Sequence, residues 1–166
     1  RIRVRCHLED ITRADFYGFV VPFAQELMEL SNQSSLKDAV KIRLCDTMGY
    51  GLPMPEAMLP RSVPKLVYGL LHEAGVPSRC LEWHGHNDFH KVLINAVSAW
   101  LYGCSAANGT LFGFGERTGN PPIEALIIEY MGIKGAANGI NTKVITEAAD
   151  YFRKEIDAHI PSNYPF

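Results

Sequence analysis

Two histidines placed two positions apart, His84 and His86, are the residues of this chain whose types and spacing point most directly to chemistry. Alternate side chains of a β-strand project from the same face, so both imidazoles share one face if they lie on a strand. Two such imidazoles can hold one divalent ion; with carboxylate and water ligands they suit zinc, manganese or iron and do not exclude magnesium. We predict a divalent metal site here, the alternative being two histidines that only form hydrogen bonds.

The next two residues, Asn87 and Asp88, have two interpretations of equal weight. They could orient the histidines through hydrogen bonds around the metal. They could instead cap the helix that follows.

A second group of polar residues alternates near the start of the chain, where Arg5, His7 and Glu9 would share one face of a strand. A guanidinium there could bind a carboxylate through two hydrogen bonds, as a 2-oxo acid would require. We take Arg5 and His7 as candidate substrate-binding residues and Glu9 as a candidate catalytic residue.

Three further candidates for substrate binding follow later predicted strands: Thr47, Glu116 and Arg117. For Asp46, beside Thr47, we slightly prefer a role as a charge at a helix entry. The alternative for Glu116 and Arg117 is a salt-bridged turn.

The hydrophobic pattern predicts four strands, each followed by a helix, which is typical of a parallel α/β protein. Pro22 is expected to kink the first helix, Ser62 to cap the second and Gly75 to end it. The predicted strands cover about 1–9, 40–47, 81–84 and 106–114, and the last helix covers about 142–158.

Two parallel architectures compete, the doubly wound sheet and the closed barrel. The glycines at 113, 115 and 119 do not have the Gly-x-Gly-x-x-Gly spacing of a dinucleotide-binding turn. Polar residues instead gather at the carboxyl ends of the strands, where barrels build active sites. A barrel needs eight strands and about 250 residues. We therefore predict an α/β fold that forms the second half, strands 5 to 8, of a TIM (β/α)8 barrel.

The overall composition excludes several classes of protein. The chain is 47% hydrophobic and 20% charged, with a net charge of -2 and a pI near 6.3, so neither disorder nor nucleic-acid binding is expected. No apolar run is long enough for a membrane helix, and no signal peptide is evident. The four cysteines lie far apart, which favours reduced thiols. We expect a cytoplasmic protein.

Several segments resemble a known family, the metal-dependent acyl-CoA lyases and Claisen-type synthases built on the HMG-CoA lyase-like TIM barrel. It includes 2-isopropylmalate synthase, homocitrate synthase and the Re-type citrate synthase. The segment 84–88, His-Gly-His-Asn-Asp, resembles the family's seventh-strand motif, and 113–120, Gly-Phe-Gly-Glu-Arg-Thr-Gly-Asn, resembles the eighth. Residues 5–10 and 46–49 are similar to the fifth and sixth strands. The resemblance spans residues 1 to about 130.

The resemblance implies that His84 and His86 bind a divalent metal (Zn, Mn or Mg), with Asn120 on or near it, and that the 2-oxo acid chelates this ion. Thr47 and Arg5 would contact this substrate, and Glu9 would be an acid or an orienting group. The implied reaction is a Claisen condensation of acetyl-CoA with the 2-oxo acid, followed by thioester hydrolysis.

The family's first-strand carboxylate and its histidine beyond the barrel have no counterpart here, so the chain is expected to be a piece of a longer protein. The full-length protein is expected to be a homodimer. Residues 1–140 would form four β/α units, and 141–166 a terminal helix that leads to a post-barrel segment. After Asp88 the family usually has an apolar residue and glycine, whereas this chain has Phe-His-Lys at 89–91, which leaves the shape of the nearby pocket open.

Two other functions remain possible on sequence grounds. A lyase or aldolase could use the same barrel and ion, although lyases of this superfamily place a cysteine-bearing glycine loop where this chain has 113–117. The synthase is therefore favoured. The third function is a non-catalytic half-barrel remnant, suggested by the missing first-strand carboxylate. The sequence does not distinguish pyruvate, oxaloacetate, 2-oxoisovalerate and 2-oxoglutarate as the 2-oxo acid.

Overall fold

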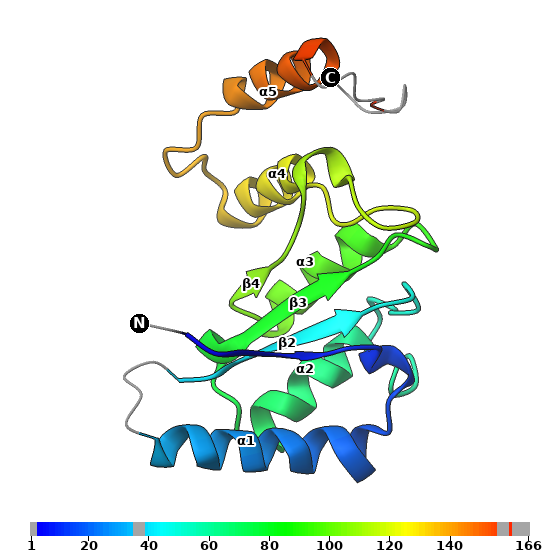
Figure 1. The fold of residues 1–166 in the computed structure, drawn as a ribbon, viewed down its shortest axis with the longest axis vertical. Helices are drawn as coiled ribbons and strands as arrows, with labels where there is room; N and C mark the ends of the chain where they lie inside the picture. Colours follow the sequence, from blue (N-terminus) through cyan, green and yellow to red (C-terminus); the bar gives the residue numbers. More distant parts are fainter. Residues whose placement is uncertain (1–2, 35–38, 156–159, 161–166) are drawn as a thin grey trace.

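The computed structural model describes residues 3–34, 39–155 and 160, and its centre is a sheet of four parallel strands in the order β1-β2-β3-β4 (Figure 1). Each strand precedes a helix along the chain, which confirms the predicted parallel α/β class. The strands are β1 (Arg5–Leu8), β2 (Lys41–Asp46), β3 (Leu81–Gly85) and β4 (Ala106–Ala107). The helices are α1 (Val21–Gln33), α2 (Val63–His72), α3 (Val92–Tyr102), α4 (Ile123–Lys134) and α5 (Lys143–Glu155).

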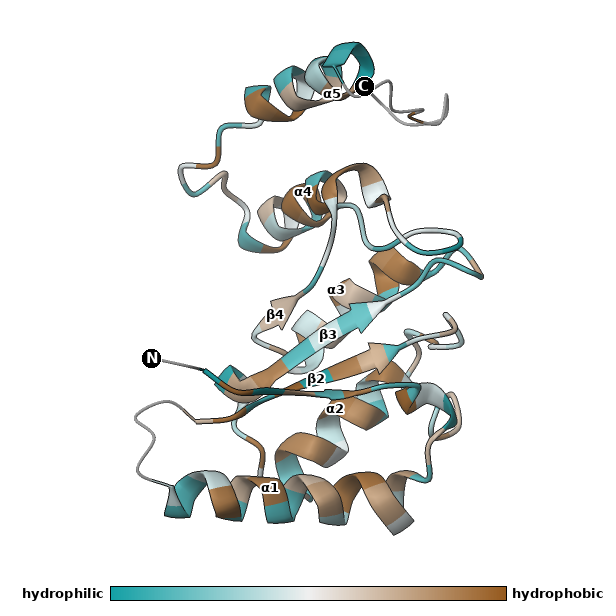
Figure 2. Ribbon diagram, viewed as in Figure 1, coloured by the Kyte–Doolittle hydropathy of each residue, from teal (hydrophilic) through white to brown (hydrophobic). Residues whose placement is uncertain are grey.

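The two faces of the sheet differ in chemistry because side chains alternate along each strand. Ile42, Leu44, Leu81 and Trp83 are fully buried on the face that α1, α2 and α3 cover, and hydrophobic residues concentrate between these layers (Figure 2). Burying each such side chain stabilises the fold by about 1.5–3 kcal/mol. The opposite face carries charged residues and histidines.

The register of the strands sets which residues of this second face lie side by side. His7 is opposite Arg43, and Arg43 is opposite Glu82, so these three form one row across the sheet. Cys45 is opposite His84 in the next row toward the carboxyl ends. Residues far apart in the sequence thus become neighbours.

The first helix begins differently from the prediction. A short π-helix, Phe16–Val20, precedes α1, and the carboxylate of Asp15 accepts a hydrogen bond from the backbone N–H of Gly18 at its start. Pro22 lies in the first turn of α1, where a missing N–H costs nothing. The structure gives no bend angle at Pro22, so the kink stays a prediction. Ser62 caps α2 as predicted, since its hydroxyl accepts a hydrogen bond from Lys65 N at 3.3 Å.

The fourth strand is shorter than the predicted 106–114, because β4 covers Ala106–Ala107 alone. Beyond it the chain packs against the start of α4: a Cβ on Gly109 would lie 2.5 Å from the carbonyl oxygen of Pro121. The buried carboxylate of Glu124 then accepts a hydrogen bond from Phe112 N at 3.0 Å, which holds a 3-10 turn at Leu111–Gly113 in place of strand pairing.

The carboxyl-terminal helix α5 lies at one end of the molecule, beyond α4 (Figure 1), and one of its side chains contacts the loop that follows β4. The ring of Phe152 contacts those of Phe112 and Phe114, with ring centroids 5.2 and 5.8 Å apart. The helix was predicted over about 142–158; residues 156–159 lie outside the described part of the chain. None of the described helices has the length and apolarity that a membrane crossing requires.

Candidate metal centre and substrate site

The two predicted metal ligands, His84 at the end of β3 and His86 just beyond it, point their Nε2 atoms toward each other. These atoms are 3.3 Å apart, and the rings are nearly perpendicular at 89°. Two nitrogen ligands of a tetrahedral metal ion, each about 2.0–2.1 Å from it, are separated by roughly 3.3–3.4 Å. The pair is therefore spaced as two ligands of one ion would be.

His86 is buried just beyond the end of β3, and His84 is partly buried beside it. Burial and the neighbouring imidazole of His86 lower the pKa of His84, and a neutral imidazole is the form that binds metal. The Nδ1 atoms of both rings are buried and have no hydrogen-bond partner among the described residues. The spacing of the two Nε2 atoms and their limited exposure to water fit a divalent ion.

Asn120, the third predicted metal ligand, lies directly beside this pair. Its amide donates a hydrogen bond of 3.0 Å to the carbonyl of Gly85, which separates the two histidines in the chain. Its backbone N–H bonds the carbonyl of Gly113 at 3.0 Å, and a Cβ on Gly115 would overlap its Oδ1 atom. The glycines of the loop let the buried amide approach this closely. Whether Asn120 binds the metal stays a prediction.

The two residues after the histidines have separate contacts, neither of which is to an imidazole in the described structure. Asn87 accepts a hydrogen bond of 3.4 Å from Val92 N, the first residue of α3, which favours the capping alternative. Asp88 accepts two hydrogen bonds from Arg117, at 2.9 and 3.0 Å. This ion pair lowers the pKa of Asp88.

The candidate catalytic carboxylate, Glu9, extends from the end of β1 with 62% of its side chain exposed. The hydroxyl of Thr47 donates to its Oε2 atom at 2.8 Å and accepts from Asp10 N, also at 2.8 Å. The Nδ1 atom of His7 lies 3.9 Å from its other oxygen. Thr47 thus holds Glu9 in position at the carboxyl ends of β1 and β2.

A cysteine that the sequence analysis did not select also lies at this site. The ligand atoms of Cys45, His7 and Glu9 all lie within 4.8 Å of one another, so this group could hold a metal too. Burial raises the pKa of Cys45 to about 12, which disfavours the thiolate that metals bind. We therefore prefer the histidine pair. The alternation of Cys45 with Thr47 is the sequence signal that could have found this thiol.

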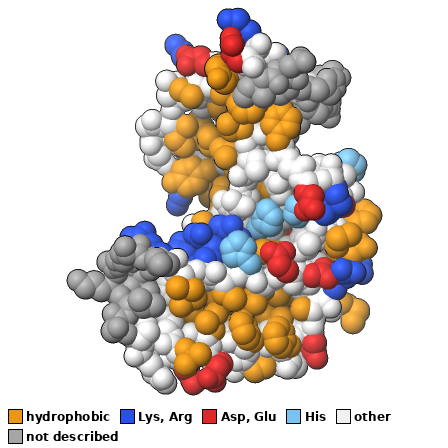
Figure 3. All heavy atoms as spheres, in the orientation of Figure 1, with side chains coloured by type: hydrophobic (Ala, Val, Ile, Leu, Met, Phe, Trp, Pro, Cys, Tyr) orange, Lys and Arg blue, Asp and Glu red, His pale blue; other side chains and the backbone are white. Residues whose placement is uncertain are grey.

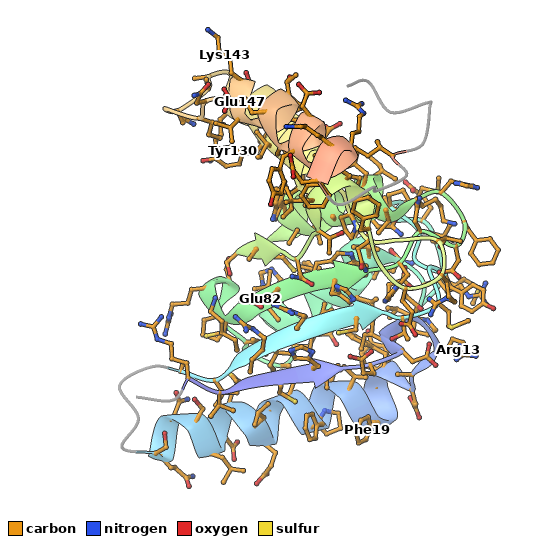
Figure 4. The ribbon with its side chains drawn as sticks, turned by 45° about the horizontal axis from the view of Figure 1, so that its top comes forward. Arg13, Phe19, Glu82, Tyr130, Lys143 and Glu147 are labelled. Carbon is orange, nitrogen blue, oxygen red and sulfur yellow. The ribbon has the colours of Figure 1, made fainter. Side chains whose placement is uncertain are left out.

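Arg5, predicted to bind substrate, lies deeper on the sheet and contacts a buried carboxylate. Its Nε and Nη2 atoms are 2.7 and 3.1 Å from the oxygens of Glu82, which Lys41 and Arg43 also contact at 2.8 and 2.9 Å. Hydrogen bonds from these three cations outweigh the effect of burial and lower the pKa of Glu82 to about 2. Glu82 lies toward the end of the sheet opposite to Arg13 (Figure 4).

The other two predicted substrate residues, Glu116 and Arg117, lie in the loop after β4. Arg117 forms the ion pair with Asp88 and also donates to the backbone carbonyl of Thr47. Glu116 is 74% exposed on its side chain and 3.6 Å from Arg117. These contacts match the salt-bridged turn that the sequence left as the alternative; contact with substrate stays a prediction.

The carboxylate of Asp46 faces the helices and is buried. Its oxygens accept hydrogen bonds of 2.8 Å from the hydroxyl of Thr12 and from Gly51 N. Desolvation raises its pKa. Asp46 therefore anchors the loops that follow β1 and β2, and only its neighbour Thr47 faces the site.

The polar side chains of this site come from the carboxyl ends of adjacent parallel strands, which is the arrangement of α/β-barrel enzymes. On the exposed face of the sheet, histidines lie next to acidic groups on one side and to a band of Lys and Arg on the other (Figure 3). The family assignment agrees with this class: the HMGL-like family model matches residues 2–152, so the chain belongs to that family.

Several curated relatives of this chain are synthases. The chain is 67% identical over 98% of its length to a Citrate (Re)-synthase of Syntrophus aciditrophicus, of which it covers 25%. It is 54% identical over 99% of its length to a Citrate (Re)-synthase of Clostridium kluyveri, of which it covers 36%. More distant relatives include a 2-isopropylmalate synthase of Methanocaldococcus jannaschii at 28% identity. The chain spans a quarter to about a third of these proteins.

A solved structure shows a similar fold. Hydroxymethylglutaryl-CoA lyase from Pseudomonas aeruginosa matches with a TM-score of 0.73 and 19% identity over 98% of this chain and 52% of that one. At this identity the likeness concerns the fold alone. The parallel sheet of this chain therefore resembles that of the HMG-CoA lyase TIM barrel.

Proposed function

We propose that this chain forms strands 5 to 8 of a barrel whose active site condenses acetyl-CoA with a 2-oxo acid. The proposal of a half-barrel is supported by the match of nearly the whole chain to 52% of a lyase chain. The observation that carries the proposed site is the pair of Nε2 atoms of His84 and His86, 3.3 Å apart at the carboxyl end of the sheet.

In this proposal His84 and His86 hold a divalent ion, with Asn120 beside them. A bound ion of this kind supplies Lewis acidity that polarises the ketone of the 2-oxo acid. The lowered pKa of His84 favours its neutral imidazole, and the contact of Asn120 with Gly85 fixes the turn between the two histidines. His86 is buried and His84 partly buried, and reduced contact with water strengthens electrostatic interactions there.

Glu9 is proposed to orient or protonate a reacting group at the mouth of the site. Its Oε2 atom accepts the hydroxyl of Thr47, which leaves Oε1 facing His7. Thr47, His7 and Glu9 come from two adjacent strands, so the register of β1 with β2 aligns them. Arg5, Glu116 and Arg117 are proposed to bind substrate through their charged groups, each of which also forms an ion pair within the protein.

We further propose that the 2-oxo acid is oxaloacetate and that the product is citrate. The support is the identity of 67% and 54% to two proteins named Citrate (Re)-synthase, against 28% to a 2-isopropylmalate synthase. A homodimeric full-length protein and a cytoplasmic location stay predictions.

The test uses the full-length protein with acetyl-CoA, a divalent ion and one of four 2-oxo acids: oxaloacetate, pyruvate, 2-oxoisovalerate or 2-oxoglutarate. We expect release of free thiol with oxaloacetate and none when the acid is omitted. No release with any of the four would contradict the proposed reaction. Cleavage of 3-hydroxy-3-methylglutaryl-CoA in place of condensation would favour the lyase.

A further inference from the structure

Three cations surround the single buried carboxylate of Glu82 on the face of the sheet that carries the histidines. Arg5, Lys41 and Arg43 all contact this carboxylate, whose side chain is only 4% exposed. One negative charge cannot balance three positive ones, so the described residues leave an excess of two positive charges there. We call these four residues the Glu82 cluster. Such an excess favours a bound anion.

The Glu82 cluster lies directly below the metal and substrate site. Arg43 and Glu82 are two residues before Cys45 and His84 on adjacent strands, so the same face carries both rows. Two residues of a strand span about 6.6 Å.

The three cations of the Glu82 cluster differ in their distance from the histidines along the sheet and in how far their side chains are exposed. Arg43 shares its row with His7 and Glu82, whereas Arg5 and Lys41 are opposite each other one row farther from the histidines. Arg43 is also the most enclosed, with 16% of its side chain exposed against 41% for Arg5 and 40% for Lys41. Its Nε and Nη2 atoms donate to Glu82, and its Nη1 atom has no partner among the described residues. Arg43 is thus the cation that faces the site.

We infer that Arg43 binds the second carboxylate of a 2-oxo dicarboxylic acid and thereby selects it over 2-oxo monocarboxylic acids. The inference rests on the proposed function. The two carboxyl carbons of oxaloacetate are three bonds apart, about 4 Å, and with its carboxylate oxygens the molecule spans about 6 Å, comparable to the row spacing of about 6.6 Å between His84 and Arg43. A longer diacid would reach past this row. Glu82 is a positioning residue, because its carboxylate fixes two nitrogens of the guanidinium and leaves the third for substrate.

The test compares oxaloacetate with 2-oxobutyrate, which has the same number of carbons and a methyl group in place of the second carboxylate. We expect Arg43→Gln in the full-length protein to raise KM and Kd for oxaloacetate about 10- to 100-fold, because the variant loses a charge-assisted hydrogen bond to the substrate. The values for 2-oxobutyrate and the KM for acetyl-CoA should change no more than about twofold. Binding is measured by calorimetry without acetyl-CoA.

Lys41→Gln is the matched control, because it removes one positive charge from the same carboxylate one row deeper. We expect it to keep the preference for oxaloacetate. Arg43→Lys keeps the charge without the planar guanidinium and should recover part of the preference. Glu82→Gln should weaken oxaloacetate binding less than Arg43→Gln does. Thermal unfolding of each variant shows whether it is folded.

The outcomes separate this inference from the proposed function. If Arg43→Gln weakens both acids alike, or if Lys41→Gln has the same effect as Arg43→Gln, the inference is wrong even though condensation proceeds. If oxaloacetate binding depends on Arg43 but no thiol is released, the inference holds and the proposed reaction is wrong. If Arg43→Gln does not fold, Arg43→Lys becomes the test variant. A preference for oxaloacetate in Arg43→Lys as strong as that of the wild type then overturns the inference.

Discussion

The Nε2 atoms of His84 and His86 point toward each other and are 3.3 Å apart. This distance suits a hydrogen bond between the two rings, and it equally suits two ligands of one metal ion. Both Nδ1 atoms lack partners among the described residues. At the scale of single residues, this pair and the contact between Thr47 and Glu9 are the features that carry the proposed chemistry.

The first prediction concerns metal binding. Replacing both His84 and His86 with alanine in the full-length protein should reduce its bound zinc or manganese by at least about tenfold, because the two ligands of the ion are lost. Metal content after dialysis is the measurement. His72→Ala is the control, since that histidine stacks on Tyr68 in α2, away from the site. Unchanged metal content in the double variant would refute the histidine pair as the metal site.

The second prediction concerns the hydroxyl of Thr47. Thr47→Val keeps the shape of the side chain but removes the donor to Glu9 and the acceptor for Asp10 N. We expect kcat to fall about tenfold and the free energy of unfolding to fall by about 1 kcal/mol. Thr47→Ser should retain most activity. Full activity in Thr47→Val, measured as thiol release, would mean that Glu9 does not need this contact.

At the scale of elements, the side chains of β2 and β3 alternate between two faces of the sheet, so each strand contributes both to the hydrophobic core and to the site. One face of these strands packs Ile42, Leu44, Leu81 and Trp83 against the helices, and the other carries the Glu82 cluster and the histidines. A one-residue shift in register would exchange the two sets, so the hydrophobic core fixes the geometry of the site.

The third prediction concerns pH and the Glu82 cluster. The pKa of Glu82 is about 2 in the folded protein against an ordinary 4.5, so its stabilising effect is complete above pH 4.5 and is lost as the pH falls toward 2. Glu82→Gln should lower the free energy of unfolding by about 2 kcal/mol or more at pH 7, because three cations lose their counter-charge.

Urea unfolding of wild type and Glu82→Gln between pH 7 and 3 is the measurement. The difference between them should shrink below pH 4.5, since protonated glutamic acid resembles glutamine in charge. Exposed Glu29→Gln on α1 is the control and should show no such trend. A difference that stays constant across this range would contradict the role of the ionised carboxylate.

At the scale of the whole molecule, Arg117 connects the loops that follow three different strands. It contacts Asp88 after β3 and the carbonyl of Thr47 after β2, and it lies itself in the loop after β4. These loops surround the histidine pair and Glu9. Their relative positions therefore depend on an ion pair that joins segments 29 residues apart in the chain.

The fourth prediction follows from this connection. Arg117→Gln should lower the free energy of unfolding and weaken metal binding, because Asp88 and the adjoining loop lose their anchor. Denaturant unfolding and metal titration are the measurements. Lys154→Gln, at a side chain that is 83% exposed, is the control and should change stability by no more than about 0.5 kcal/mol. Equal effects of the two substitutions would show that the connection is not needed.

The sequence predicted the four β/α units and the grouping of polar residues at strand ends because both depend on short-range alternation. It misplaced the end of β4, where Gly109 packs on Pro121 and Glu124 bonds Phe112 N, contacts that no local pattern reveals. It also did not reveal the short π-helix before α1, after which Pro22 falls in the first turn of that helix.

The spacing of His84 and His86 by itself determined that both imidazoles share a face, because a strand repeats every two residues. Only the tertiary structure decided which charges meet. Arg5, Lys41 and Arg43 converge on Glu82 because of the register between three strands, and Arg117 finds Asp88 because two loops are brought together. Pairing between strands depends on long-range packing of the core, which is not encoded in any local window of the sequence.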